Sequence, residues 1–193
     1  MPRTLILLML LPLAACMGGA RQSGETAYYD LATGAATTET TPQNIRSVEV
    51  VAPSWLSSNR MQYRLAYSDP TRRREYAGSR WVAPPAEMLA QGLRKTLVSG
   101  TGACRLRLEL EEFVQVFDAA ENSRASLEMR AALLPLQGDA PLARRTFTLN
   151  RHTASADARG GAAALNEAAV ELSNELRSWL AGAAGVAAAC GGK

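Results

Sequence analysis

The cysteine at position 16 stands in the sequence context of a lipid-attachment site. Residues 13–16 read Leu-Ala-Ala-Cys and follow an apolar run that begins after Arg3. Small residues directly before a cysteine form a site at which a lipoprotein signal peptide is removed. We therefore expect cleavage between Ala15 and Cys16, with a diacylglycerol on the Cys16 thiol and an N-acyl chain such as palmitate on its amine. The alternative is an ordinary secretory signal in which Cys16 is incidental.

Residues 1–15 form a signal peptide in this interpretation, because their apolar run of about 11 residues is shorter than the roughly 20 that a membrane-spanning helix needs. Residues 16–27 then make a lipidated, flexible tether, and residues 28–193 form the folded domain. Acyl chains contribute about 0.8 kcal/mol per buried methylene, so two or three of them hold a protein firmly on a bilayer. Met17 stands where an aspartate would retain a lipoprotein in the inner membrane, so we expect an outer-membrane location facing the periplasm.

The two remaining cysteines, Cys104 and Cys190, are candidates for a disulfide in an oxidising compartment. Spacing alone does not establish connectivity. The sequence therefore leaves open whether they are bonded or whether one thiol is buried and the other lies loose in the tail. They do not form a C-x-x-C motif, so we expect no redox active site.

The sequence contains no recognisable catalytic constellation. His152 is the only histidine, so a hydrolytic triad would have to use it, and no G-x-S-x-G motif accompanies it. The lack of further histidines also counts against a metal centre. Glu111 and Glu112 are neighbours in a predicted strand, so we expect them on opposite faces and not as a catalytic pair. We predict a protein that is not an enzyme, with no metal and no cofactor beyond the acyl groups on Cys16.

Basic residues offer one candidate contact surface. Arg72, Arg73 and Arg74 follow a predicted turn and could form a basic tip that contacts anionic lipid headgroups or an acidic partner. The alternative is an ordinary solvated turn. The net charge of the chain is +3, which is too small to indicate a nucleic-acid partner.

Aromatic residues offer a second candidate surface, a partner interface. Tyr76, Arg80 and Trp81 precede a predicted helix and are of the types enriched in protein interfaces. Packing of Trp81 beneath that helix is the alternative. Trp55 is expected either in an exposed loop that contacts a partner or lipid, or as a cap on the core.

Hydrophobic periodicity predicts the elements that position these residues. Alternation typical of half-buried strands runs through residues 45–51, 61–67, 104–110, 125–133 and 146–150. Residues 72–76 are expected to return beside 61–67 as a hairpin, and a bulge or an exposed strand end is expected near residues 112–113. Helical spacing predicts one helix beginning at Pro84–Pro85 and another over residues 161–180. This order predicts an α+β fold, a single compact domain with two helices packed on one face of a mainly antiparallel sheet.

Six stretches of the mature chain carry a family resemblance when taken together. They are residues 28–31 (YYDL), 53–56 (PSWL), 61–64 (MQYR), 76–89 (YAGSRWVAPPAEML), 104–117 (CRLRLELEEFVQVF) and the closing helix over 165–180. In this order they resemble the ABC-type transport auxiliary lipoprotein family, the PqiC-like outer-membrane lipoproteins.

The resemblance implies a role in transport between membranes. Such lipoproteins accompany transporters that consist of an ABC ATPase, a permease and an MCE-domain protein, and that move phospholipids or other hydrophobic molecules. The implied role is a non-enzymatic auxiliary or docking subunit that is held to the membrane by its lipid anchor. The implied partners are the MCE-domain protein, the permease and the ATPase, and the implied assembly is a homo-oligomeric ring.

Two alternatives from other classes remain open at this point. One is a monomeric lipid carrier that binds lipid in a cavity, and the other is a structural lipoprotein of an outer-membrane assembly. A docking ring should self-associate without bound lipid, whereas a carrier should be monomeric and should co-purify with lipid.

Overall fold

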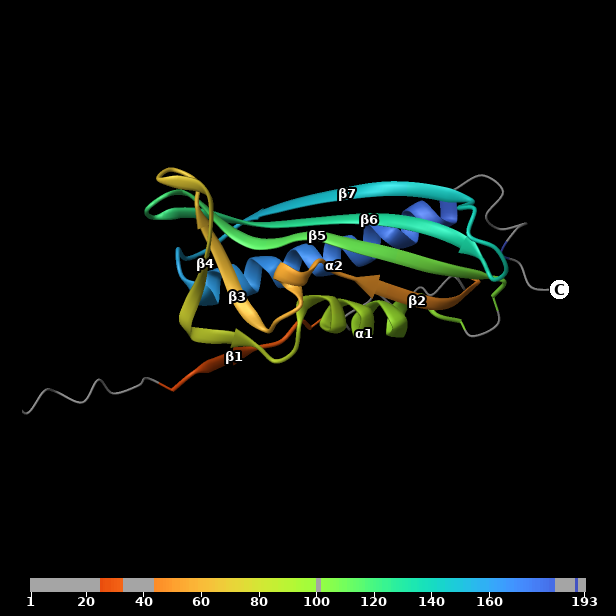
Figure 1. The fold of residues 1–193 in the computed structure, drawn as a ribbon, viewed down its shortest axis with the longest axis horizontal. Helices are drawn as coiled ribbons and strands as arrows, with labels where there is room; N and C mark the ends of the chain where they lie inside the picture. Colours follow the sequence, from red (N-terminus) through yellow and green to blue (C-terminus); the bar gives the residue numbers. More distant parts are fainter. Residues whose placement is uncertain (1–24, 33–43, 100–101, 183–189, 191–193) are drawn as a thin grey trace, which may run out of the picture.

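The described part of the chain forms seven strands and two α-helices (Figure 1), and the periodicities predicted both helices and six of the strands but not the short strand over residues 27–29. The computed structural model describes residues 25–32, 44–99, 102–182 and 190, so the expected signal peptide, Cys16 and most of the tether lie outside it. In chain order the elements are β1 (Ala27–Tyr29), β2 (Ile45–Val51), a 3-10 helix η1 (Ser54–Leu56), β3 (Arg60–Leu65), β4 (Asp69–Trp81), α1 (Pro85–Leu97), β5 (Cys104–Ala119), β6 (Asn122–Pro135), β7 (Ala143–His152) and α2 (Ala158–Gly182).

The sheet is built around β5, which pairs with three other strands. Along one edge, β6 runs antiparallel to almost the whole of β5. Along the other edge, β2 runs parallel to the first half of β5 and β3 runs parallel to its second half. The order of the main path is β1-β4-β3-β5-β6-β7, with β2 beside β5. The strands β1 and β7 are therefore the edges of this path.

A β-bulge interrupts β5 near its middle. Leu110 lies opposite Met129 and Glu112 lies opposite Glu128, so Glu111 is the extra residue without a partner of its own. Of the two alternatives that the sequence left open near residues 112–113, a bulge or an exposed strand end, the bulge is present.

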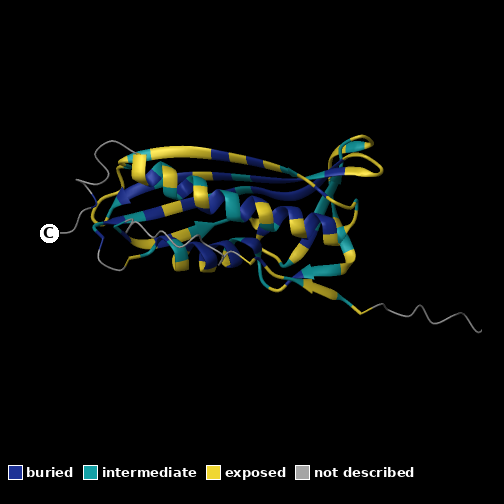
Figure 2. Ribbon diagram, turned by 180° about the vertical axis from the view of Figure 1, so that it is seen from behind, coloured by how far each residue is buried: buried dark blue, intermediate teal, exposed yellow. Residues whose placement is uncertain are grey.

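Both helices cover the same face of the sheet, and we call the opposite side the helix-free face (Figure 2). The helix α1 packs on β2, and α2 lies across β6, β7 and β5. Apolar side chains fill the layer between helices and sheet. The predicted inward rows are buried, namely Ala125, Leu127, Met129, Ala131 and Leu133 on β6, and Leu165, Ala168, Ala169, Leu172, Leu176 and Leu180 on α2. Trp179, which was predicted on the same face of α2, is only partly buried.

Local sequence explains where the helices begin. Pro85 opens α1, since proline lacks only an N–H that the first turn leaves unbonded anyway. Asp157 caps α2, because its Oδ1 accepts the Gly160 N–H at 2.8 Å. This hydrogen bond, together with one from Ser155, holds the pKa of the Asp157 carboxyl below its usual range.

Gly161 allows α2 to approach the sheet, because a Cβ there would lie 2.1 Å from Oε1 of Gln115.

The predicted α+β fold with two helices on one face of the sheet is confirmed. The long ladders, β5–β6 and β6–β7, are antiparallel as expected. The contacts β1–β4, β2–β5 and β3–β5 are parallel, which makes the sheet mixed. The strands β4 and β7 extend beyond the predicted segments 72–76 and 146–150, because exposed residues at their ends blur the alternation of the pattern.

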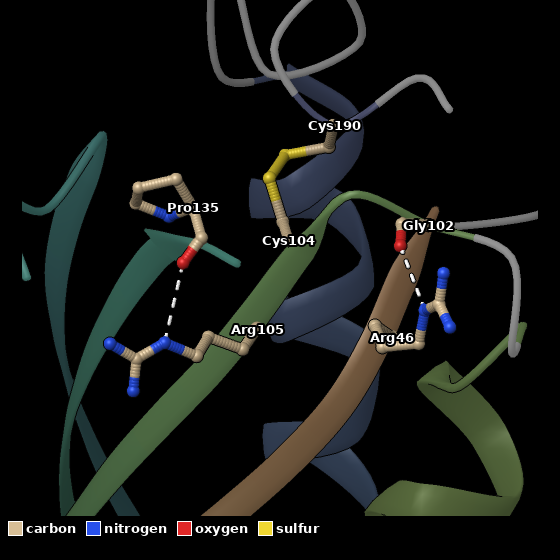
Figure 3. Close-up of a disulfide and its surroundings, with 6 residues drawn as sticks. All are labelled: Arg46, Gly102, Cys104, Arg105, Pro135 and Cys190. Carbon is tan, nitrogen blue, oxygen red and sulfur yellow. Dashed lines mark hydrogen bonds between the residues drawn. A yellow bond between two sulfur atoms is a disulfide. The ribbon is translucent and has the colours of Figure 1, made fainter. Parts of the chain in front are cut away.

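Cys104 and Cys190 form a disulfide, so the pairing that the sequence left open is present (Figure 3). The bond joins the start of β5 to the chain beyond α2, and the Ala103 N–H donates a hydrogen bond to the Cys190 carbonyl at 3.0 Å. The two cysteines are 86 residues apart in the sequence. The bond therefore closes a loop that contains β5, β6, β7 and α2.

Removal of this bond should destabilise the domain measurably. For the variant Cys104→Ala/Cys190→Ala we expect the free energy of unfolding to fall by about 2–5 kcal/mol, because the unfolded chain regains the entropy of a large loop. Urea denaturation of both proteins measures the difference. A reducing agent should lower the stability of the wild type and leave the variant unchanged; equal stability of the two oxidised proteins would contradict the prediction.

Candidate functional site

Glu112 on β5 binds two arginines from the β3–β4 hairpin. Arg73 donates two hydrogen bonds to its carboxylate, Nη1 to Oε1 at 2.8 Å and Nη2 to Oε2 at 3.0 Å. Arg64 on β3 donates a further bond to Oε2. Glu112 is 8% exposed, and a buried carboxylate needs such partners to offset its lost hydration. The cluster combines two positive charges with one negative charge, so it is net positive.

The three consecutive arginines of β4 do not form one basic tip. The turn of the hairpin lies at residues 66–68, so Arg72, Arg73 and Arg74 belong to the strand and alternate between its two sides. Arg73 binds Glu112, and Arg74 lies on the opposite side, in register with Tyr63. The expectation of one cluster of three is therefore wrong. Arg72 is exposed, and its contact with an anionic headgroup or an acidic surface stays a prediction.

The bulge at Glu111 also overturns the expectation that Glu111 and Glu112 point to opposite faces. Glu111 forms an ion pair with Arg130, and Arg130 lies between the buried residues Met129 and Ala131, so it points away from the core. Glu112 binds Arg64, which also lies on the helix-free face. The extra residue of the bulge thus brings both carboxylates to the same face, where arginines neutralise them.

Of the two tryptophans proposed for a partner interface, Trp81 is a core residue. It is 1% exposed and packs against Phe113 with 5.3 Å between ring centroids. A partner cannot reach it in the folded domain, so the interface role is wrong and the alternative of core packing is correct. Trp55 in η1 is 53% exposed and borders a shallow hollow beside Glu111. Its role in an interface stays a prediction.

Tyr76 begins a buried chain of hydrogen bonds that sequence reasoning missed. Its hydroxyl donates to Oε1 of Gln115 at 2.7 Å, and Nε2 of Gln115 donates to Oγ of Ser123 at 2.8 Å. The hydroxyls of Ser123 and Thr153 lie 2.6 Å apart. Burial raises the pKa of Tyr76, so the phenol stays protonated and remains a donor. The signal available in the sequence was Gln115 itself, a polar residue at an inward position of an alternating strand.

Arg80 also forms hydrogen bonds within the domain. Its guanidinium donates to the backbone carbonyls of Tyr76 and Ser79. Both Arg80 and Tyr76 are half-buried, so each presents only part of its side chain at the surface. A role for them at a partner interface stays a prediction.

The helix-free face carries a shallow groove of about 560 Å³ over β5, β6 and β7. Its middle is a row of three paired residues, in which Ala132 of β6 lies between Arg107 of β5 and Arg144 of β7. Side chains of directly opposite residues share a face, so the small Ala132 leaves a dip between two arginines. Leu134, which is 5% exposed, and Pro141 add apolar surface to the groove.

Most carboxylates near this groove form ion pairs with arginines other than Arg107 and Arg144. Glu109 and Glu111 form ion pairs with Arg130, and Asp139 pairs with Arg105. Arg107 reaches a carboxylate only at 3.9 Å, on Glu109. The ion pairs of the described residues include none for Arg144. The groove is therefore basic at its centre.

The chemistry-bearing residues elsewhere are sparse. His152 is exposed at the end of β7. Within residues 25–32, 44–99, 102–182 and 190, no three His, Cys, Asp or Glu side chains are grouped as a metal site. No helix in the same ranges has both the length and the apolar character needed to cross a membrane.

The family model for the ABC-type transport auxiliary lipoprotein component matches residues 29–176. The chain belongs to this family. The matched span of this auxiliary lipoprotein runs from the end of β1 into α2 and includes both the Glu112 cluster and the groove. Family membership makes the chain a lipoprotein component of an ABC-type transport system.

Solved structures support the fold of this auxiliary lipoprotein. A Xanthomonas campestris protein is 23% identical and has a TM-score of 0.66, with 79% of this chain and 94% of that one covered. An uncharacterized protein is 17% identical and has a TM-score of 0.58, with coverages of 80% and 97%. A search of curated proteins gives no match.

The two tryptophans of this auxiliary lipoprotein should differ sharply on truncation. Trp81→Ala removes a buried aromatic ring and should lower the free energy of unfolding by about 3–5 kcal/mol. Trp55→Ala removes an exposed one and should change it by less than about 0.5 kcal/mol. Urea denaturation monitored by circular dichroism measures both. Equal losses of stability would show that Trp55 also supports the core.

The ion-pair cluster should be sensitive to loss of its carboxylate. Glu112→Gln leaves Arg64 and Arg73 without their counter-charge and should lower the free energy of unfolding by about 2–4 kcal/mol, since the pair is largely but not wholly buried. Glu111→Gln is the matched control, because its ion pair is exposed and should contribute less than about 1 kcal/mol. Comparable effects of the two substitutions would contradict the structural role of Glu112.

Proposed function

We propose that this protein is an outer-membrane lipoprotein, lipidated at Cys16 and facing the periplasm. It serves as a non-enzymatic auxiliary or docking subunit of an ABC/MCE-type system that moves phospholipid or other hydrophobic molecules between membranes. Its partners are the MCE-domain protein, the permease and the ATPase of that system, and its own assembly is a homo-oligomeric ring.

The family match over residues 29–176 carries this proposal. The sequence Leu-Ala-Ala-Cys at residues 13–16 supports the lipid anchor, because it combines small residues with a cysteine after an apolar run. The Cys16 lipids fix the protein to the bilayer, and the tether that follows leads into β1 at the edge of the sheet.

The packing of the domain favours a docking role over a carrier role. Side chains such as Leu108, Phe113 and Leu172 fill the layer between the sheet and the helices. The hollows on the described surface, such as the groove at Arg107, are shallow and bordered by charged residues. A domain of this kind contacts its partners through its surface, while the ATPase supplies the energy of transport.

Fractionation of host cells tests the anchor and the partners together. The full-length wild type should sediment with the outer membrane and, after detergent extraction, should co-purify with the MCE-domain protein. Cys16→Ala should fold normally but leave the membrane fraction, because it lacks the acylated thiol. Circular dichroism checks folding, and immunoblots of separated membranes measure location.

The mass and lipid content of the purified protein separate the docking proposal from its alternatives. Light scattering should give a defined oligomer, and extraction of the same sample should give no stoichiometric phospholipid beyond the covalent anchor. A monomer with bound phospholipid would overturn the docking role in favour of a lipid carrier. Retention of Cys16→Ala in the membrane fraction would overturn lipidation as the means of attachment.

A further inference from the structure

We infer that the groove on the helix-free face binds an extended, acidic and aliphatic segment of a partner protein. Arg107 and Arg144 bind its carboxylates, and the apolar surface around Leu134 receives its aliphatic side chains. This inference deepens the proposed function and rests on it for the identity of the partner as a component of the transport system. The geometry and charge of the groove carry it.

The spacing of the two arginines defines the anionic part of the occupant. Arg107, Ala132 and Arg144 are successive members of one row across three strands. Neighbouring strands lie about 4.8 Å apart, so the backbones of the two arginines are roughly 10 Å apart. Flexible guanidinium side chains can close on a carboxylate above Ala132 from both sides. Such charge-assisted hydrogen bonds are among the strongest that proteins form.

The charge balance of the groove shows that this site is available. Arg130 forms ion pairs with Glu109 and Glu111, and Arg105 forms one with Asp139. These pairs use the nearby acidic groups and leave the positive charge of Arg144 uncompensated among the described residues. Arg144 is exposed, so a ligand reaches it without any rearrangement of the sheet.

The apolar part of the occupant follows from the surroundings of the groove. Leu134 faces away from the main core yet is only 5% exposed. Pro141 lies beside it, and the loop between β6 and β7 exposes Leu136 by 43% and Leu142 by 46%. Leucines exposed next to a basic dip match a ligand that alternates carboxylates with aliphatic side chains.

The position of the groove favours a protein segment over a lipid surface. It lies near the end of the domain that holds the Cys104–Cys190 disulfide, because Arg105 and Leu134 pair there next to Cys104. The strand β1, which leads from the proposed lipid anchor, enters at the other end of the long axis (Figure 1). The groove therefore lies at the end of the domain opposite the point where the chain from the proposed anchor enters. The strand β7, which borders the groove, is an edge of the sheet.

A peptide-binding measurement on the full-length protein in neutral detergent micelles tests the inference. The probe is a short fluorescein-labelled peptide that alternates glutamate with leucine, and its matched control alternates glutamine with leucine. Fluorescence anisotropy should show binding of the acidic peptide alone. Arg107→Gln/Arg144→Gln should weaken that binding about a hundredfold, because each charge-assisted contact contributes about a factor of ten.

Two further variants separate the groove from general charge effects. Arg159→Gln/Arg177→Gln removes the same charge from α2 on the other face and should leave peptide affinity unchanged. Ala132→Phe keeps both groove arginines but fills the dip between them, so it should also abolish binding. Thermal unfolding of each variant confirms that it is folded. Equal losses for the two arginine pairs, or unaltered binding to Ala132→Phe, would overturn the inference.

The lipid alternative has its own measurement. Micelles doped with phosphatidylglycerol should leave the affinity of the acidic peptide within about twofold of its value in neutral micelles. Displacement of the peptide by the doped micelles would assign the groove to a lipid headgroup and overturn the inference. Cell fractionation and co-purification test the proposed function separately. If they fail but the acidic peptide still binds, the groove remains a peptide-binding site and only the identity of its partner is overturned.

Discussion

The carboxylate of Glu112 holds the β3–β4 hairpin to the centre of the sheet. The backbone contact between β3 and β5 is short. It involves the segment from Tyr63 to Leu65 and one further hydrogen bond from the Ala66 N–H to the Phe117 carbonyl, so the two arginine contacts add a substantial share of the attachment. One carboxylate that accepts bonds from Arg64 and Arg73 ties three strands together. Through β4 the same contact positions β1, and with it the point at which the chain from the proposed anchor enters the domain.

The bulge at Glu111 makes this arrangement possible. Leu110 and Phe113 both face the core, with two residues between them where strict alternation allows one. In a regular strand of the same sequence without the bulge, an inward Leu110 would leave position 113 pointing outward and would lose the contact between Phe113 and Trp81. The bulge therefore supports the core on one face and the Glu112 cluster on the other. It also lies between the parts of β5 that pair with β2 and β3.

Local patterns in the sequence predicted the elements, but not the contacts between distant ones. Alternation placed the inward rows of β5 and β6 correctly because each row faces one continuous core. No tight turn joins β2 or β3 to β5, so no local signal in the sequence predicts these parallel pairings. Tryptophan is common both at interfaces and in cores, so the residue type of Trp81 fits either position. Only its burial in the structure distinguishes the two. The prediction that the arginines of β4 form one tip was wrong because the strand begins earlier than its polar composition indicates.

The distribution of contacts gives the two ends of the domain different properties. At the β3–β4 end, the arginines of the Glu112 cluster are held by their carboxylate, and this end lies near the entry of the chain through β1. At the disulfide end, the bond between Cys104 and Cys190 fixes the start of β5, and Arg107 lies three residues further along the same strand. A rigid strand presents its side chains at defined spacings, and this lowers the entropic cost of ordering them around a ligand. The disulfide therefore contributes to the groove indirectly, because it holds the start of β5, the strand that carries Arg107, to the chain beyond α2.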